Sequence, residues 1–457
     1  MSKQTESYSW GFLRSIIQPA LDVCAITLII ILSGCAQYET IPVSSIHSRT
    51  TAISLESATN DLINLIQDIE SHGTRDGMSQ PRKIGTAYTL LSQAKTRSDS
   101  TAPVAYIINF ENNQGYAIMS ADERMPSLLC FVENGNLSPN DTIQNPGELI
   151  FLQGLDDYCQ RKIKGFEDIE RLDFKIAPHP EEMFDTGPYV TYGPWENTVY
   201  KVGGYCPVKW GQRTPYNDYC PIKKGERTLA GCVAVAVGQL MATHKFPSSS
   251  NGYSYDWDAM TSSKWAYHIS DDAQHQISRL MQQLGKKNNL NMDYGRKSSG
   301  AKFQHSMRTL SNFGYANPGE LIKYDISEIT GDLKAGYPVL CSGFSHKSKF
   351  EIFDITIASW LEKGHAWLLH GLLERKRSFT LYNSDGSVAG SGIDTTYYPL
   401  CNWGWNGDKD GYYLSNVFDA CNGPDYGDYT RSNDNICEGD TAYYYRHGVE
   451  VIKGIRK

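Results

Sequence analysis

The sequence predicts an α+β protein with two folded regions, and three observations carry this prediction. Apolar residues at helical spacing and an apolar hairpin pattern fill a first region that ends near residue 150. A segment rich in proline and glycine follows over about residues 175–199. The remaining residues, about 200–457, are long enough to form a second domain with its own core.

The first region is expected to combine one helix with a small antiparallel sheet. Apolar residues recur at helical spacing over residues 55–69. Two apolar runs, 104–110 and 116–119, flank a polar turn that ends in glycine, which is typical of a β-hairpin. A third strand is expected at 128–132, and a helical extension is expected to reach about residue 172.

The N-terminus is expected to be an export signal that is not part of the fold. A short apolar stretch, Val23 to Leu32, is too short to cross a bilayer as a helix. The tetrapeptide Leu32-Ser33-Gly34-Cys35 resembles the lipobox of bacterial lipoproteins. We therefore expect a lipoprotein-type signal peptide over 1–35, lipid attachment at Cys35 and a tether over 36–52. A simple signal peptide with a chance cysteine, or a short membrane anchor, is the alternative.

Charge and cysteine spacing argue against two classes of function. The formal net charge is −8 and no basic run occurs, so no nucleic-acid partner is expected. Apart from Cys24 and Cys35, nine of the 11 cysteines remain, and none has the spacing of a zinc or thioredoxin-like site. No metal and no cofactor is therefore expected. Disulfides and buried free thiols both remain open for these cysteines.

Cys232 has the sequence surroundings of a nucleophile. It follows Gly231 and opens an apolar run at helical spacing that continues to Met241. A thiol at a helix N-terminus faces unpaired N–H groups and the positive end of the helix dipole, and both favour the reactive thiolate. The backbone N–H of the same residue would point at a substrate oxygen. A core cysteine on a buried helix is the alternative explanation.

His365 has the residue type of a general base. It opens the apolar, strand-like run Gly364-His365-Ala366-Trp367, and imidazole titrates near neutral pH. The small neighbours would leave room for a bound peptide. A buried core histidine is the alternative explanation.

Three further residues would complete a thiol protease site. Gln212 offers a side-chain amide for a developing oxyanion, although a glutamine is usually a surface residue. Asn402 offers an acceptor that would fix the imidazole tautomer, and Trp403 offers an indole that would keep water from that bond. An aromatic turn packed in the core is the alternative for this last pair.

In their order along the chain, these motifs resemble the streptopain family of bacterial cysteine proteases. The resemblance covers about residues 50–457 and includes an N-terminal propeptide. It rests on Trp210-Gly211-Gln212, Gly231-Cys232-Val233-Ala234, Gly364-His365-Ala366 and Asn402-Trp403-Gly404-Trp405, and on Ser120-Ala121-Asp122-Glu123-Arg124-Met125-Pro126 in the propeptide.

The resemblance implies an inhibitory propeptide over 53–174, an activation linker over 175–199 and a papain-like catalytic domain over 200–457. It makes Cys232 the nucleophile and His365 the base. The remaining implied roles belong to Gln212 as oxyanion donor, Asn402 and Trp403 as residues that orient and shield the histidine, and Ser299 and Gly364 as residues that line the substrate groove.

The function that follows is a self-inhibited cysteine endopeptidase. Its partners would be protein or peptide substrates, its own propeptide, and a bacterial membrane or cell surface held through the lipid. Three departures from the family pattern affect specificity: Ala230 in place of threonine, His370 in place of an acidic residue, and a longer apolar segment at 344–363 that would narrow or cap the cleft.

Two alternatives stay open. One is a protease-like lipoprotein that binds peptides or a host partner without cutting. The other is a different acyl-transfer enzyme, such as an amidase or a transglutaminase.

Overall fold

The computed structural model describes most of both regions. The described residues are 51–71, 82–91, 103–139, 141–155, 158–159, 189–197, 199–344, 351–352, 355–357, 364–383, 386–418 and 448–457. The expected signal peptide, Cys35, most of the tether, the helical extension beyond 159, and the linker before 189 lie outside them. Within the described residues, no helix has the length and apolar character needed to cross a membrane.

Contacts divide the chain into two units. The described residues of the smaller unit are 189–191, 379–383 and 386–392. The larger unit comprises Thr51–Pro180, Tyr192–Ser378 and Ile393–Lys457, and it therefore holds both predicted regions. The contacts of the candidate site discussed below lie within the larger unit.

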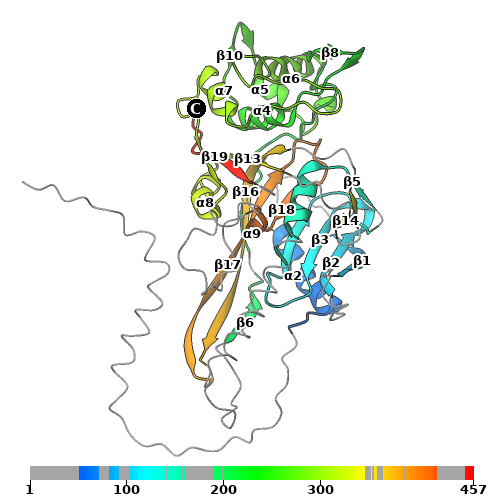
Figure 1. Ribbon diagram of the computed structural model, residues 1–457, viewed down its shortest axis with the longest axis vertical. Coiled ribbons are helices and arrows are strands. Elements are labelled where there is room, and N and C mark those ends of the chain that lie inside the picture. Colours follow the sequence, from blue (N-terminus) through cyan, green and yellow to red (C-terminus); the bar gives the residue numbers. More distant parts are fainter. Residues whose placement is uncertain are drawn as a thin grey trace, which may run out of the picture. The chain divides into compact units, whose positions relative to one another are not determined.

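The N-terminal region is a helix packed on an antiparallel sheet (Figure 1). Helix α2 (Leu55–Ser71) follows Ser54, whose Oγ accepts a hydrogen bond from the Ser57 N–H at 3.1 Å. Its buried face consists of Ala58, Leu62, Leu65, Ile66 and Ile69, at the predicted spacing. The sheet is formed by β1 (Ile84–Leu91), β2 (Pro103–Phe110), β3 (Tyr116–Ser120) and β4 (Leu128–Val132).

The hairpin and the third strand are confirmed as β2, β3 and β4, whereas β1 was not predicted. Most of β1 is exposed or half-buried, so its sequence lacks the apolar run that marks its neighbours. A 3-10 turn, η1 (Glu111–Asn113), lies between β2 and β3, and a short strand, β5 (Thr142–Ile143), follows β4. A further helix starts at residue 146 and continues through the described residues to 155.

The second region has a helical part and a sheet part. The helices gathered at the top of Figure 1 are α4 (Cys232–His244), α5 (Trp257–Met260), α6 (Asp271–Leu284) and α7 (His305–Asn312), with the turn η2 (Ala266–His268). Two short hairpins accompany them, β8 (Ile222–Lys223) with β9 (Glu226–Arg227) and β10 (Ser249–Ser250) with β11 (Tyr253–Ser254).

The sheet part continues the sheet of the first region. Its strands are β12 (Glu320–Lys323), β13 (Val339–Gly343), β16 (His365–Tyr382), β17 (Val388–Asn402), β18 (Gly411–Tyr413) and β19 (Glu450–Lys453), with helices α8 (Ile326–Lys334) and α9 (Ser415–Phe418). The order is β1-β2-β3-β4-β18-β17-β16-β13-β19-β12, and β6 (Tyr189–Trp195) and β7 (Tyr200–Gly203) pair with β16. Because β4 pairs antiparallel with β18, one sheet joins both regions. The predicted α+β class is confirmed.

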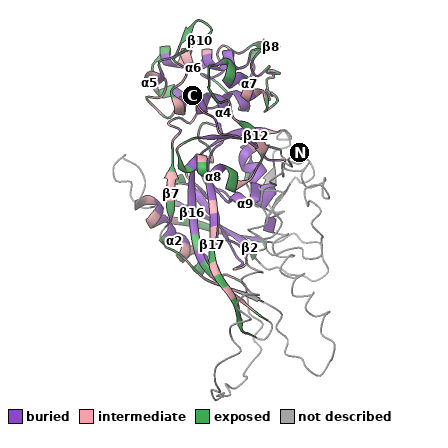
Figure 2. Ribbon diagram, turned by 90° about the vertical axis from the view of Figure 1, so that its left-hand side faces the viewer, coloured by how far each residue is buried: buried purple, intermediate pink, exposed green. Residues whose placement is uncertain are grey.

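Strand β16 separates two hydrophobic cores. Trp367 and Leu369 belong to a core that also includes the first region, whereas Ala366 and Leu368 belong to the core of the helical part. Successive side chains of a strand point to opposite faces, so a strand buried on both sides reads as a continuous apolar run. Figure 2 shows this burial along β16. His365 is the first residue of the strand and therefore lies where the two cores meet.

The structure corrects one expectation about the proline-rich linker. Proline density was expected to block regular structure there, but β6 includes Pro194 and pairs with β16. An outer strand tolerates proline because one of its sides needs no ladder hydrogen bond. The Arg377 guanidinium stacks over the rings of Tyr192 and Trp195, at 3.6 and 4.4 Å from their centres, and so fixes this part of the linker.

Candidate active site

One pocket brings together five of the predicted site residues. Cys232, His365, Gln212, Ser299 and Gly364 all line it, although more than 100 residues of chain separate the cysteine from the histidine. Its complete lining is Pro146, Gln212, Leu229, Cys232, Lys297, Ser298, Ser299, Gly364, His365 and Trp405. Asn402 and Trp403 are absent from this lining and are buried behind it.

The local backbone places Cys232 at the start of α4. Gly231 precedes the helix with φ +94°, a conformation that favours glycine. A Cβ at Gly231 would lie 2.8 Å from the Met292 sulfur, so a larger residue would also displace the end of that side chain. The carbonyl oxygen of Gln212 accepts a hydrogen bond from the Ala230 N–H at 3.0 Å and ties the two segments together. The Cys232 side chain is half-buried, whereas the other cysteines of the described residues are buried free thiols.

The protonation state of Cys232 differs from the sequence expectation. Burial raises the pKa of the thiol above its ordinary value. The backbone N–H groups of Ala366 and Val233 counteract only part of this rise. The helix N-terminus was expected to favour thiolate; desolvation is larger than the effect of these hydrogen bonds and favours the thiol. Cys232 is therefore a thiol near neutral pH in this structure.

His365 is held by the main chain of the neighbouring turn. Its Nε2 donates a hydrogen bond to the Trp403 carbonyl oxygen at 2.8 Å, which fixes the proton on that nitrogen. The imidazole lies parallel to the Trp367 ring, with 6.3 Å between centres, and edge-on to the Trp405 ring. Burial lowers the pKa of His365 to about 4, and the bond to Trp403 opposes this only slightly. The imidazole is therefore neutral near pH 7.

Asn402 was expected to be the acceptor for His365, but its amide makes other contacts. Its Nδ2 donates to the Val208 carbonyl at 2.8 Å, and its Oδ1 accepts from the Gly404 N–H at 3.1 Å. The carbonyl of the next residue, Trp403, occupies the acceptor position instead. Asn402 thus shapes the turn that presents this carbonyl.

The Trp403 indole also faces away from the expected bond. Its Nε1 donates to the Lys409 carbonyl at 2.9 Å, and its ring packs against Trp367 with 5.0 Å between centres. The indoles next to the imidazole belong to Trp367 and Trp405, which we did not predict for this role. Trp367 lies two residues after His365 on β16, and that spacing could have indicated it because alternate residues of a strand share a face. Trp405 lies in the turn after β17, where this pattern does not apply.

Ser299 and Gly364 lie at the pocket wall in different ways. The Ser299 hydroxyl contacts the Leu229 carbonyl at 2.8 Å and accepts from the Gly295 N–H at 3.0 Å, so it supports the loop of the wall. Gly364 leaves room for the Phe344 ring, which a Cβ would approach to 2.7 Å. Among the described residues, no group of His, Cys, Asp and Glu is arranged to hold a metal ion.

Comparisons with known proteins agree with this geometry. Residues 210–413 match the model of the peptidase C10 family, and residues 56–159 match the model of the Spi protease inhibitor. Streptopain of Streptococcus pyogenes serotype M1 is 23% identical over 67% of this chain and 73% of its own length. The resemblance to the streptopain family is confirmed. Below, residues 210–413 are called the peptidase region and residues 56–159 the inhibitor region, after the models that they match.

A solved structure supports the fold. A fragment of prointerpain A from Prevotella intermedia superposes with a TM-score of 0.50 at 19% identity, covering 82% of this chain and 99% of the fragment. The similarity extends across both regions of the chain, as expected for a propeptide domain followed by a protease domain.

The inhibitor region reaches the pocket through the start of its second helix. Pro146 lines the pocket beside the predicted catalytic residues. Asn145 precedes it and caps the helix, because its Oδ1 accepts from the Gly147 N–H at 2.9 Å and from the Glu148 N–H at 3.3 Å. The Asn145 Nδ2 donates to the Asp408 carbonyl of the peptidase region at 2.7 Å. The inhibitor region therefore contacts the turn that holds His365.

The segment 344–363 also contacts the inhibitor region where it is described. Its strands β14 (Glu351–Ile352) and β15 (Ile355–Ile357) form a hairpin, and β15 pairs parallel with β5. β5 ends at Ile143, shortly before Asn145. The sequence predicted a segment that narrows or caps the cleft; its described strands pair with β5 of the inhibitor region but do not line the pocket.

Replacing Gly147 by valine tests how closely the inhibitor region packs here. A Cβ at Gly147 would lie 2.0 Å from the Trp403 ring, so the helix start must move away. We expect the free energy of unfolding to fall by about 1–3 kcal/mol, as for other overpacked sites. Thermal and denaturant unfolding measure this. Gly331→Val is the matched control, because nothing lies within 4 Å of a Cβ there; equal losses in both variants would contradict the close packing.

Proposed function

We propose that this chain is an exported cysteine endopeptidase that is made as a self-inhibited zymogen. The observation that carries the proposal is the pocket in which Cys232, His365 and Gln212 meet with Pro146 of the inhibitor region. A thiol, an imidazole and an amide around one cavity are the groups that acyl transfer through a thioester needs. The C10 peptidase match in the second region and the inhibitor match in the first region support the same assignment of roles.

The reaction uses the pocket residues in fixed roles. His365 takes the thiol proton, and the Cys232 sulfur attacks the carbonyl carbon of the scissile peptide bond. The Cys232 N–H and the Gln212 amide stabilise the resulting oxyanion. The same proton then passes from His365 to the leaving amine, and a water molecule hydrolyses the thioester.

The full chain holds this machinery in a resting state. Cys232 is protonated, and the Nε2–H of His365 bonds to the Trp403 carbonyl, which leaves Nδ1 as the nitrogen that accepts the thiol proton. Pro146 occupies part of the wall where a substrate backbone would lie. We propose that cleavage within 175–199 releases the inhibitor region, so that a substrate can reach Cys232 and His365 past the position of Pro146.

The location of the enzyme is proposed from the N-terminal motif. Leu32-Ser33-Gly34-Cys35 would place a lipid on Cys35 and hold the zymogen at a bacterial membrane or cell surface. Cleavage in the linker would then release the peptidase region from the anchor.

The rate at which Cys232 is alkylated tests the resting state as a function of pH. Because its pKa is raised, thiolate is the minor form below that pKa, and its fraction grows as pH rises. We expect iodoacetamide to label Cys232 in the full-length chain at a rate that climbs about tenfold per unit from pH 6 to 8. A rate independent of pH over this range would reveal a thiolate–imidazolium pair and contradict the resting state.

The same measurement addresses a rival function. The bonds of His365 and the pairing of β15 with β5 would also suit a protein that binds peptides without cutting them. After the inhibitor region is released, a peptidase would label at Cys232 rapidly at neutral pH, with the other described thiols protected by burial. A chain whose Cys232 stays as slow as a buried thiol in that state is a binding protein.

A further inference from the structure

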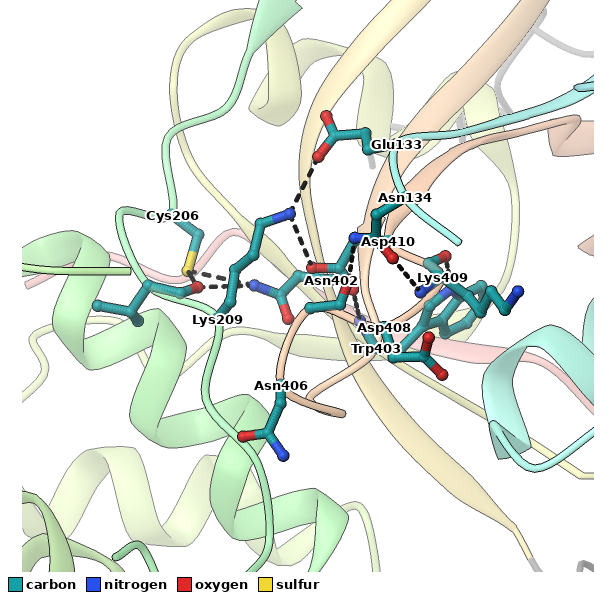
Figure 3. Close-up of polar contacts among 12 residues, drawn as sticks. Glu133, Asn134, Cys206, Lys209, Asn402, Trp403, Asn406, Asp408, Lys409 and Asp410 are labelled. Carbon is teal, nitrogen blue, oxygen red and sulfur yellow. Dashed lines mark hydrogen bonds and ion pairs between the residues drawn. The ribbon is translucent and has the colours of Figure 1, made fainter. Parts of the chain in front are cut away.

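A charged cluster lies directly behind the pocket, where the two regions meet. The Lys209 ammonium is 3.1 Å from the Glu133 carboxylate of the inhibitor region and 3.8 Å from the Asp410 carboxylate of the peptidase region (Figure 3). The Glu133 N–H also donates to the Asp410 carbonyl at 2.9 Å. The Asp410 side chain is almost completely buried. One lysine is thus shared between a propeptide acid and an enzyme acid.

The three charges depend on one another. Burial opposes the charged form of Lys209, yet the attraction of Glu133 and Asp410 outweighs it and raises the pKa of the lysine. Burial raises the pKa of Asp410 to about 7, and Lys209 counteracts part of that rise. Glu133 and Asp408 are the acidic groups that raise it further. Without the lysine, the charged form of Asp410 would be disfavoured more strongly.

Asp410 is connected to His365 through a single residue. Its Oδ1 accepts a hydrogen bond from the Trp403 N–H at 2.9 Å. The carbonyl of Trp403 accepts from His365 Nε2 at 2.8 Å. The carboxylate therefore fixes the backbone of the residue that orients the imidazole, and an ionised acceptor makes that bond stronger than a neutral one.

The residues on either side of Lys209 form hydrogen bonds to the same turn. The Val208 carbonyl accepts from the Asn402 side chain at 2.8 Å, and the Trp210 carbonyl accepts from the Asn406 N–H at 3.1 Å. Figure 3 shows Lys209 reaching from this segment towards Asp410 and Glu133. Gln212, three residues after Lys209, lines the pocket. A shift of Lys209 would therefore disturb the supports of both the imidazole and the oxyanion amide.

We propose that the Lys209–Asp410 ion pair is a positioning device for His365, which acts through the Trp403 backbone, and that Glu133 couples this device to the inhibitor region. In the full chain Glu133 also binds the Lys209 ammonium, so Asp410 shares the lysine with it. When the inhibitor region leaves, Asp410 keeps the lysine alone and holds the Trp403 turn more firmly. The inference deepens the proposed peptidase function and rests on it, because positioning matters only if His365 is the base.

The first test does not require activity. In the full chain with Cys232→Ala, hydrogen exchange reports the protection of the Trp403 amide. Lys209→Met is expected to lower that protection about tenfold at pH 7, the effect of one weakened hydrogen bond. Lys209→Arg should retain it. The matched control is Lys245→Met, which removes a lysine from the exposed ion pair with Asp258. Unchanged Trp403 protection in Lys209→Met would overturn the proposal.

A second variant covers the case in which Lys209→Met does not fold. Asp410→Asn keeps an oxygen acceptor for the Trp403 N–H but removes the titrating carboxylate. In the chain that keeps Asp410, the Trp403 amide should lose protection from exchange as the pH falls from 8 to 6. Protonation of the Asp410 carboxylate weakens it as the acceptor of the Trp403 N–H. Asp410→Asn should show the same protection at both pH values. A pH dependence that persists in Asp410→Asn would overturn the proposal.

The last test uses self-cleavage of the full chain with Cys232 intact. Glu133→Gln should accelerate self-cleavage about threefold or more, since one charged contact of the inhibitor region is lost. Lys209→Met should slow self-cleavage about tenfold, and the acidic limb of the pH–rate profile should move to higher pH. If Glu133→Gln has the wild-type rate, the coupling to the inhibitor region is wrong. If the wild type never cleaves itself but the exchange effects hold, the peptidase function fails and the positioning stands.

Discussion

A full chain with Cys232→Ala is expected to lose both self-cleavage and the turnover of peptide substrates. Alanine removes the only atom of the pocket that can form the thioester, so the remaining groups have no nucleophile to assist. Loss of a protease nucleophile costs on the order of a millionfold in kcat. The measurement is turnover of a fluorogenic peptide, together with the appearance of a shortened chain on a gel.

Cys220→Ala is the matched control for this prediction. Cys220 is a buried free thiol of the same region and does not line the pocket. It should therefore retain wild-type turnover per folded molecule. Activity that survives Cys232→Ala, or that disappears equally in both variants, would remove Cys232 from the reaction.

Gln212→Ala is expected to have the second largest effect. The Gln212 side chain is 8% exposed and lines the pocket beside Cys232, whereas its backbone carbonyl holds Ala230 in place and is kept in the variant. Removal of one oxyanion donor lowers kcat by roughly 10²–10³-fold and changes KM little. Steady-state kinetics of the processed enzyme separate the two constants. A higher KM with unchanged kcat would make Gln212 a substrate-binding residue instead.

The parts of the fold that were predictable are those with a strong local signal. The buried face of α2 follows helical spacing, and β2 and β3 follow the hairpin pattern around a polar turn. The helix that opens at Cys232 was predicted because glycine precedes a long apolar run. In each case neighbouring residues along the chain determine the element, so the sequence pattern is sufficient.

The details of the site depended on contacts between distant segments. Asn402 bonds to Val208 rather than to His365, and burial raises the pKa of Cys232 by more than its backbone hydrogen bonds lower it. Both outcomes depend on which groups the fold brings together, and no local pattern encodes that. The position of Pro146 at the pocket and the pairing of β15 with β5 have the same origin, because each brings together segments that are far apart in the chain.

The cysteines show how the fold settles one question that spacing left open. Disulfides and free thiols were equally compatible with the sequence. In the described part of the chain all are free thiols, and all except Cys232 are buried. Cys421 and Cys437 lie outside the described residues. The selective exposure of Cys232 is therefore a property of the fold that the cysteine count could not reveal.

Intact-mass measurement of the purified full chain during incubation tests the central claim most directly. We predict that the wild-type chain converts to a shorter species whose new N-terminus falls within 175–199, and that the Cys232→Ala chain keeps its original mass under the same conditions. Self-cleavage that proceeds equally without the Cys232 sulfur, or a wild-type mass that stays constant while Cys232 resists alkylation, would contradict a cysteine peptidase held in check by its own propeptide.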